Sequence, residues 1–234
     1  GVRLMDLKII YLDLPFWRAE VARITLFIAD IKFDDFRINS EEFSYLQENG
    51  KLKDGTLIPF GQLPVLVING QSIAQTGGIA RICGKLSGMY PEDMIEAGEV
   101  DQIIDTVTDI NELLNPSMRE NDQAKKKEMR AELTNHDLPK YFGYLEDILN
   151  ANNSHWFVGD KMSIADIAVW GLLGWFASGV LDDIPPEILN PFERLKKLYQ
   201  EVSKNPRVRE WKIKTYAHGK TSSDEYTFDV PDSI

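Results

Sequence analysis

The stretch FGQLPVLVINGQSIAQTGGIAR, from Phe60 to Arg81, decides the fold that we predict for this chain. Pro64 precedes the apolar run VLVI, and Asn69-Gly70 separates that run from QSIA. Two short apolar runs on either side of Asn-Gly are a strong signal for a β-hairpin. The following residues, IARICGKLSG, have apolar side chains at helical spacing. The stretch therefore predicts two antiparallel strands followed by a helix.

The residues before this stretch add two strand–helix units. LKIIYL predicts a strand, RAEVARITLFIAD a helix and FDDFRI a second strand. SEEFSYLQENG predicts a second helix, with Ser40 as its N-cap and Gly50 at its end. Residues 1–88 are therefore expected to form a βαβαββα domain.

The rest of the chain has helical periodicity and few strand signals. We expect a linker over residues 89–97, an all-helical domain over 98–220 and an acidic tail over 221–234. The predicted fold class is thus α+β in the N-terminal part and all-α in the C-terminal part.

Composition excludes several classes of function. The 234 residues include 26 Lys and Arg against 37 Asp and Glu, and this net charge of −11 disfavours nucleic acid as a partner. The single cysteine, Cys83, cannot form an internal disulfide, and no apolar run approaches the length that spans a membrane. We expect a cytoplasmic protein that does not enter a membrane.

The hairpin region also has the properties of a binding site. A cis bond before Pro64 would turn the backbone groups of Leu63 outward, where an extended peptide ligand can pair with them. Gln75 and Thr76 stand at the start of a helix, whose free N–H groups favour a carboxylate. An edge-strand proline and an ordinary threonine cap would explain the same residues without a ligand.

Short motifs in a characteristic order carry a family resemblance. They are Tyr11, Arg18-Ala19-Glu20, Phe60-Gly61-Gln62-Leu63-Pro64, Gln75-Thr76, Ile79-Ala80-Arg81, Val100-Asp101-Gln102-Ile103-Ile104-Asp105, Phe157-Val158-Gly159 and Ser163-Ile164-Ala165-Asp166. Over nearly its whole length the chain resembles a cytosolic glutathione S-transferase of the tyrosine type. The pattern is most similar to the sigma-like classes, which include glutathione-dependent prostaglandin D synthases.

The resemblance implies a thioredoxin-like N-terminal domain, a homodimer, glutathione as co-substrate and no metal. It assigns to Tyr11 the stabilisation of the glutathione thiolate, which is the nucleophilic form of a thiol. A half-buried tyrosine at a strand end without a catalytic function is the alternative. The implied activity is conjugation of glutathione to hydrophobic electrophiles, as in detoxification.

The same resemblance implies where glutathione binds. Its γ-glutamyl carboxylate would contact Gln75 and Thr76, and its cysteinyl residue would pair with Leu63, beside Pro64 and Gln62. Its ammonium group would meet Asp109 of the partner subunit. Without the family, Asp101, Asp105 and Asp109 would be read as a solvated helix face.

Two departures from the family pattern affect the implied site. Phe43 and Gln47 stand where sigma-like relatives have a Trp and a Lys for the glycyl carboxylate, so Lys51 or Lys53 from the long following loop is a candidate replacement. The resemblance also implies that Arg18 contacts glutathione, but the segment LDLPFWRAE is one residue longer than usual, which leaves two alternatives for Arg18: a glutathione contact or a displaced side chain.

The hydrophobic substrate is expected against apolar side chains from both domains. These are Leu14, Phe16 and Trp17 after the first strand, with Leu114, Pro116, Leu172 and Trp175 from the helical domain. Phe16 or Trp17 in a dimer contact or in the core is the alternative.

Other conspicuous residues have structural interpretations. Ser163 and Asp166 form a predicted capping box, and Cys83 is expected to be a packing residue. The three histidines, His136, His155 and His218, lack the spacing of metal ligands. Two other functions stay open: a glutathione-dependent isomerase of the prostaglandin D synthase kind, and a non-catalytic ligand-binding or structural relative.

Overall fold

The computed structural model describes residues 5–216. The acidic tail expected over residues 221–234 lies outside the described residues, as does His218. The described chain forms two compact units. The first comprises residues 5–90 together with 210–216, and the second comprises residues 91–209.

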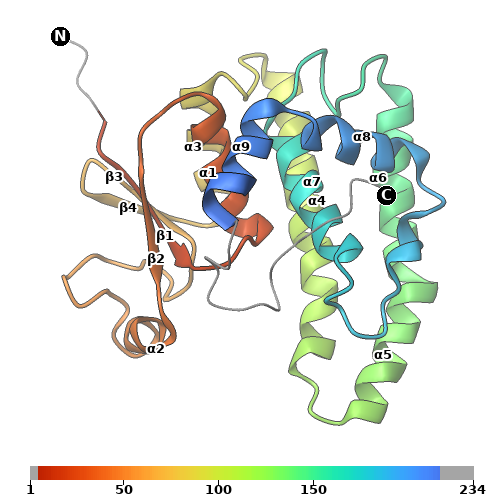
Figure 1. Cartoon of the computed structure of the whole chain (residues 1–234), viewed down its shortest axis with the longest axis horizontal. Coiled ribbons are helices and arrows are strands. Elements are labelled where there is room, and N and C mark those ends of the chain that lie inside the picture. The colour runs from red at the N-terminus through yellow and green to blue at the C-terminus, as the bar shows by residue number, and fades with distance from the viewer. Residues whose placement is uncertain (1–4, 217–234) are drawn as a thin grey trace. The chain divides into compact units, whose positions relative to one another are not determined.

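The first unit contains a four-stranded sheet and three complete helices (Figure 1). In chain order the elements are β1 (Leu7–Leu12), α1 (Trp17–Ile28), β2 (Asp34–Ile38), α2 (Ser40–Asn49), β3 (Val65–Ile68), β4 (Gln71–Ala74) and α3 (Thr76–Ser87). The strand order is β2-β1-β3-β4; β1 and β2 are parallel, and the other neighbours are antiparallel. The predicted βαβαββα order is confirmed.

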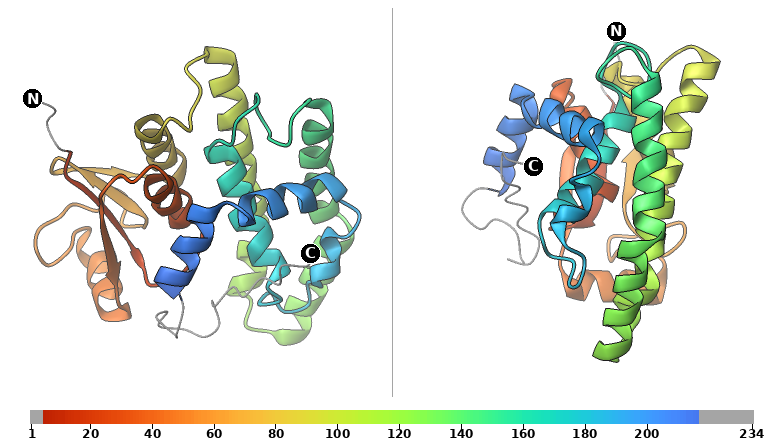
Figure 2. Two further views of the ribbon diagram at one scale, coloured as in Figure 1. Left: turned by 45° about the horizontal axis from the view of Figure 1, so that its top comes forward. Right: turned by 90° about the vertical axis from the view of Figure 1, so that its right-hand side faces the viewer.

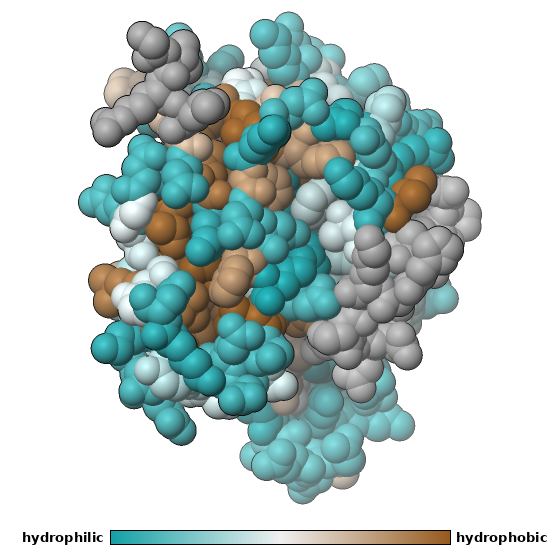
Figure 3. All heavy atoms as spheres, turned by 60° about the vertical axis from the view of Figure 1, so that its left-hand side comes forward, coloured by the Kyte–Doolittle hydropathy of each residue, from teal (hydrophilic) through white to brown (hydrophobic). Residues whose placement is uncertain are grey.

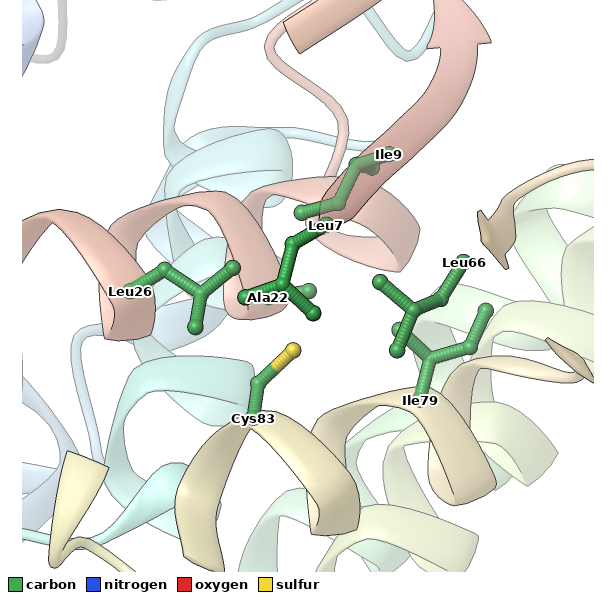
Figure 4. Close-up of a cluster of buried hydrophobic side chains, with 7 residues drawn as sticks. All are labelled: Leu7, Ile9, Ala22, Leu26, Leu66, Ile79 and Cys83. Atoms are coloured by element: carbon green, nitrogen blue, oxygen red, sulfur yellow. The ribbon is translucent and has the colours of Figure 1, made fainter. Parts of the chain in front are cut away.

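Apolar side chains cover both faces of this sheet because successive strand residues point to opposite faces. One cluster joins the sheet to α1 and α3 (Figure 4); its buried members are Leu7, Ile9, Ala22, Leu26, Leu66, Ile79 and Cys83. The cluster on the other face joins the sheet to α2 and the loop after it, with Ile10, Ile38, Leu46, Leu52, Ile58 and Val65 buried. Helices therefore lie on both faces of the sheet, and α1 and α3 share one of them.

The long loop after α2 is anchored at two points. The Ile58 N–H donates to the Gly50 carbonyl at 3.0 Å, and the Leu52 N–H donates to the Thr56 carbonyl at 2.9 Å. Leu52 and Ile58 are buried in the second cluster. The two ends of the loop are therefore held against the sheet by their own apolar side chains, and the tip between them, Lys53 to Gly55, is exposed.

The start of α2 differs from the prediction by one residue. Asn39, not Ser40, is the N-cap, and its side chain accepts a hydrogen bond from the Glu42 N–H at 2.9 Å. The Glu42 carboxylate accepts from the Asn39 N–H in return, which completes a capping box. Asn caps as well as Ser does, so composition alone did not decide between neighbouring candidates. Gly50 ends the helix with φ 66°, as predicted.

The second unit is built from helices packed around α7 (Ile164–Ala177) (Figure 2). The others are α4 (Met94–Arg119), α5 (Gln123–Asn135), α6 (Asp137–Ala151), the short η1 (Pro186–Leu189), α8 (Glu193–Ser203) and α9 (Pro206–Tyr216), whose last residues belong to the first unit. α7 contacts α4, α8 and η1, and nearly all of its residues are buried. The all-helical prediction for this part is confirmed.

The predicted capping box at the start of α7 is also confirmed. Asp166 Oδ2 accepts from the Ser163 N–H at 2.8 Å, and Oδ1 accepts from the Phe157 N–H at 2.9 Å. The Ser163 hydroxyl oxygen accepts from the Ala165 N–H at 3.2 Å. One carboxylate therefore holds both the helix start and the segment before it.

No helix among residues 5–216 combines the length and the apolar character needed to cross a membrane. The same residues contain no group of three or more His, Cys, Asp or Glu that could hold a metal ion. Apolar surface appears in patches between hydrophilic residues in the view of Figure 3. Leu57 and Phe60, in the loop before β3, are 59% and 66% exposed.

Candidate functional site

Tyr11 is the penultimate residue of β1 and is only 7% exposed. Its register partner on the parallel strand β2 is Arg37. The guanidinium carbon of Arg23, from α1, lies 5.5 Å from the centroid of the Tyr11 ring. A cation over an aromatic face at this distance favours negative charge on the phenol.

Arg23 is fully buried and is fixed by four hydrogen bonds. Its Nη groups donate to the carbonyls of Leu14 at 2.8 Å and Leu12 at 3.1 Å, which hold the loop after β1. It also donates to Glu20 Oε1 and to Asp35 Oδ1, each at 3.0 Å. A buried guanidinium needs such a complete set of acceptors, because an unpaired buried charge is strongly destabilising. Sequence reasoning missed this residue.

The predicted site residues in and after the loop before α1 differ in how far they are exposed. Leu14 and Phe16 are partly exposed, whereas Trp17, the first residue of α1, is buried. Arg18 is partly exposed, with its guanidinium carbon 5.3 Å from the Trp17 ring centroid. The Arg18 carbonyl accepts a hydrogen bond from the Thr76 hydroxyl at 3.0 Å, which ties the start of α1 to the start of α3.

The start of α3 presents backbone N–H groups that a helix cannot satisfy internally. Gln75, its N-cap, is exposed and has φ 73° and ψ 121°, a backbone conformation that is uncommon for a residue other than glycine. Thr76 is buried, and its hydroxyl donates inside the protein rather than outward. A carboxylate at this helix start would therefore be met by backbone N–H groups and by the Gln75 side chain.

The edge before β3 begins with a cis peptide bond. This bond joins Leu63 and Pro64, and the sequence alone had left its form open. Leu63 is partly exposed and packs on the cluster beneath α2, while Gln62 is exposed. From α2, Phe43 packs on the same cluster and Gln47 is exposed.

The two candidate lysines for the glycyl carboxylate have different surroundings. Lys53 Nζ lies 3.4 Å from Glu41 Oε1 and 5.6 Å from the Tyr45 ring centroid. Lys51 is exposed and forms a single β-bridge with Leu57 through its backbone. Both lysines are exposed, and Lys53 has Glu41 as an anionic neighbour.

Asp109 and Pro116, both predicted site residues, line an open groove in the helical unit. The groove lies between α4, α5 and the start of α6 and has a volume of about 670 Å³. Its lining residues are Asp109, Glu112, Leu113, Pro116, Ser117, Met129, Glu132, Leu133, Asp137 and Tyr141. The apolar residues predicted beside Pro116 lie elsewhere: Leu114, Leu172 and Trp175 are buried within the unit.

Cys83 lies inside the apolar cluster between the sheet, α1 and α3 (Figure 4). Burial raises the pKa of its thiol to about 12. The thiol therefore stays protonated near neutral pH, which is consistent with a packing residue.

The buried charges around Arg23 are the site feature that sequence reasoning did not find. Glu20 and Asp35 each accept a hydrogen bond from Arg23, and Asp35 also accepts one from Arg37. The signal available in the sequence was two charged residues, Glu20 and Arg23, three positions apart on the apolar face of α1. A helix that buries charges at this spacing needs partners from other elements.

Comparisons with known proteins identify the family. A family model described as the N-terminal domain of glutathione S-transferase matches residues 7–81, and one described as its C-terminal domain matches residues 108–215. A glutathione S-transferase from Plasmodium yoelii yoelii is 30% identical over 199 residues, which cover 83% of this chain and 87% of that protein. The chain belongs to the glutathione S-transferase family. Glutathione is the co-substrate of this family.

Solved structures of similar proteins extend the comparison. The prostaglandin synthase D of Nilaparvata lugens is 27% identical with a TM-score of 0.76, over 88% of this chain and 96% of that one. A glutathione S-transferase from the hookworm Necator americanus, described as monomeric, is 27% identical with a TM-score of 0.72, over 90% and 97%. The predicted architecture of a thioredoxin-like domain followed by a helical domain is therefore confirmed.

Proposed function

We propose that this protein is a glutathione S-transferase that joins the glutathione sulfur to hydrophobic electrophiles, and that Tyr11 stabilises the thiolate. The observation that carries the proposal is the buried Tyr11 at the end of β1 with the Arg23 guanidinium 5.5 Å from its ring. A phenolic hydroxyl that donates a hydrogen bond to sulfur favours S⁻, and a nearby cation strengthens that preference. The thiol proton would pass to solvent, and the thiolate would form the new carbon–sulfur bond while the leaving group departs with its electron pair, as chloride does from an aryl chloride.

In this proposal the peptide backbone of glutathione lies along the edge before β3. Leu63 pairs with the cysteinyl residue, and Pro64 and Gln62 flank it. Gln75 and the N–H of Thr76 meet the γ-glutamyl carboxylate at the start of α3.

The two ends of glutathione need further partners. Lys51 supplies a positive charge for the glycyl carboxylate beside Phe43 and Gln47. Asp109 of the partner subunit receives the ammonium group, so the proposed active form is a homodimer. Arg18 stays a candidate contact at the start of α1.

The electrophile is proposed to bind beside the loop after β1. Leu14 and Phe16 offer partly exposed apolar surface there, and Pro116, on α4, is a further proposed contact that is exposed in its own unit. Trp17 is buried in the first unit, and Leu114 and Leu172 are buried in the second, so we propose that these three side chains support their own units rather than contact the ligand. We further propose a cytoplasmic location and a detoxifying function, in keeping with conjugation of apolar electrophiles.

The test is the ultraviolet thiolate absorbance of protein-bound glutathione as a function of pH, measured for the native chain, for Tyr11→Phe and for the exposed control Tyr144→Phe. The Cys83 thiol, with its pKa of about 12, does not contribute below about pH 10. We expect a lowered thiol pKa in the native chain and the control, and its loss in Tyr11→Phe. Bound glutathione without thiolate in the native chain would reject the proposal.

Similarity to the prostaglandin synthase D of Nilaparvata lugens supports a second candidate, a glutathione-dependent isomerase. Conjugation consumes one glutathione for each product molecule, whereas isomerisation regenerates the thiol. Counting glutathione thiols before and after turnover, with an activated aryl chloride and with a prostaglandin endoperoxide, therefore separates the two activities.

A further inference from the structure

The side chains of Trp211 and Tyr216, from α9, form hydrogen bonds to Glu20 of α1. Trp211 Nε1–H donates to Glu20 Oε2 at 2.9 Å, and the Tyr216 hydroxyl donates to Glu20 Oε1. The Trp211 ring also packs against Phe27 and Phe33, with centroids 5.3 and 6.2 Å away. The end of α9 is therefore attached to α1 and to the segment before β2.

These contacts complete a closed ring of hydrogen bonds. Glu20 Oε1 accepts from Arg23, whose Nε donates to Asp35 Oδ1 at 3.0 Å. Asp35 Oδ2 accepts from Arg37 Nε at 3.0 Å, and Arg37 Nη2 donates to the Tyr216 oxygen at 2.9 Å. The Tyr216 hydroxyl then returns to Glu20 Oε1. Five side chains from α1, β2 and α9 thus support one another.

We propose that this ring fixes the position and the effective charge of Arg23 beneath Tyr11, and that Tyr216 is therefore a positioning residue for the chemistry at Tyr11. The inference rests on the proposed function, because it assumes that Tyr11 ionises glutathione. It assigns to residues of α9 an effect on the pKa of the bound thiol, which they exert through the buried carboxylate of Glu20.

The charge balance of the ring gives the physical reason. Two carboxylates, Glu20 and Asp35, face two guanidinium groups, Arg23 and Arg37, and Asp13 adds a further carboxylate 2.9 Å from Arg37 Nη1. Each ring carboxylate serves more than one donor. Asp35 is shared between the two arginines.

Glu20 is shared more widely still, among Arg23, Trp211 and Tyr216. The added donors draw negative charge away from Arg23, so the guanidinium keeps more of its positive field at the Tyr11 ring. These donors thereby preserve the effect of Arg23 on its neighbour.

Tyr216 remains a hydrogen-bond donor throughout the neutral range. Burial raises the pKa of its hydroxyl well above the usual value, and Glu20 raises it further, although Arg23 and Arg37 act in the opposite direction. Burial alone would lower the pKa of Arg37, but Tyr216, Asp35 and Glu20 raise it, and the net direction is a rise. Tyr216 and Arg37 therefore keep their protons while glutathione ionises.

Removing the Tyr216 hydroxyl has a predictable direction. Glu20 Oε1 then has Arg23 as its remaining donor in the ring, so it neutralises the guanidinium more completely. At an effective dielectric constant near 20, transferring about a third of a charge over about 6 Å corresponds to about 0.7 pKa units. The fraction of bound thiolate at a pH below the midpoint should fall about fivefold.

The experiment compares the native chain with Tyr216→Phe. This variant keeps the aromatic ring of residue 216, whose centroid lies 5.0 Å from the guanidinium carbon of Arg37. Tyr144→Phe, at an exposed position, is the matched control. Two pH titrations are followed for each protein. The first measures the thiolate absorbance of bound glutathione, and the second measures the absorbance of the Tyr11 tyrosinate without glutathione. The part of the second signal that is missing in Tyr11→Phe is assigned to Tyr11. We expect both midpoints to rise in Tyr216→Phe and neither to move in the control.

The outcomes separate the inference from the proposed function. If both midpoints in Tyr216→Phe equal those of the native chain, the residue is only structural and the inference is wrong, even if the protein melts earlier. If the native chain does not ionise glutathione, the proposed function fails, and the tyrosinate titration still decides whether Tyr216 acts on Tyr11.

A coupling measurement gives a second test. In Arg23→Lys the charge remains but the four hydrogen bonds cannot all form, so adding Tyr216→Phe should shift the midpoints less than it does in the native background. Equal shifts in both backgrounds would show that Tyr216 does not act through Arg23. If Tyr216→Phe does not yield folded protein, Trp211→Phe removes another donor to Glu20 and carries the same expectation.

Discussion

Replacing Asp166 by Asn should change how the stability of this protein depends on pH. Burial raises the pKa of Asp166 from 3.8 to about 7, although the Ser163 and Phe157 N–H groups that donate to it act in the opposite direction. The folded chain therefore binds this proton more tightly than the unfolded chain does. The stability that protonation contributes is complete below about pH 4 and is lost as the pH rises through 7.

The magnitude follows from the two pKa values. Between pH 5 and pH 8 the native chain should lose about 3 kcal/mol of unfolding free energy through this group. Asn cannot titrate, so its own contribution to stability does not depend on pH. It offers one acceptor oxygen to the two backbone N–H groups of Phe157 and Ser163, and the lost hydrogen bond lowers the free energy of unfolding by about 1–3 kcal/mol. The stability gap between the native chain and Asp166→Asn should therefore narrow by about 3 kcal/mol from pH 5 to pH 8.

Urea unfolding followed by circular dichroism at several pH values measures this gap. Asp160→Asn, at an exposed position just before α7, is the control and should differ from the native chain by the same small amount throughout. A gap for Asp166→Asn that stays constant, or that widens with pH, would refute the reasoning about its burial.

Two further predictions concern buried groups. Glu20→Gln should lower the free energy of unfolding by about 3 kcal/mol, because one amide oxygen cannot accept from both Arg23 and Trp211, which now donate to different carboxylate oxygens. Glu48→Gln, at an exposed position, is the control and should change the free energy of unfolding by less than about 0.5 kcal/mol. Equal melting curves for the two variants would contradict this prediction. Cys83 should react with a thiol reagent at neutral pH only after the chain unfolds in urea, and rapid labelling of the native protein would contradict its burial.

Much of the fold was predictable because its signals are local. Asn69 and Gly70 have φ 49° and 81°, as a tight hairpin requires, and the runs on either side pair as β3 and β4. The capping box of Ser163 and Asp166 likewise spans four residues. The N-cap of α2 was misplaced by one residue, since Asn39 and Ser40 are both good caps and only the hydrogen bonds distinguish them.

The residues of the candidate site were chosen from short motifs. Tyr11, the Leu63-Pro64 bond and Gln75-Thr76 all lie in the first unit, and their contacts with glutathione stay a prediction. For Trp17 the structure favours the alternative, a side chain in the core, and the sequence did not decide between the two because burial depends on what packs over the start of α1.

The sequence by itself determined the strands, the helices and the short motifs, because each depends on the spacing of residues that are near neighbours along the chain. Only the tertiary structure decided which charges are buried together. The Tyr216 hydroxyl and Glu20 are 196 residues apart in sequence, and the ring that they close also needs Asp35 and Arg37 from β2. Buried charges are stable only when every partner is in place, and no local pattern specifies partners that distant.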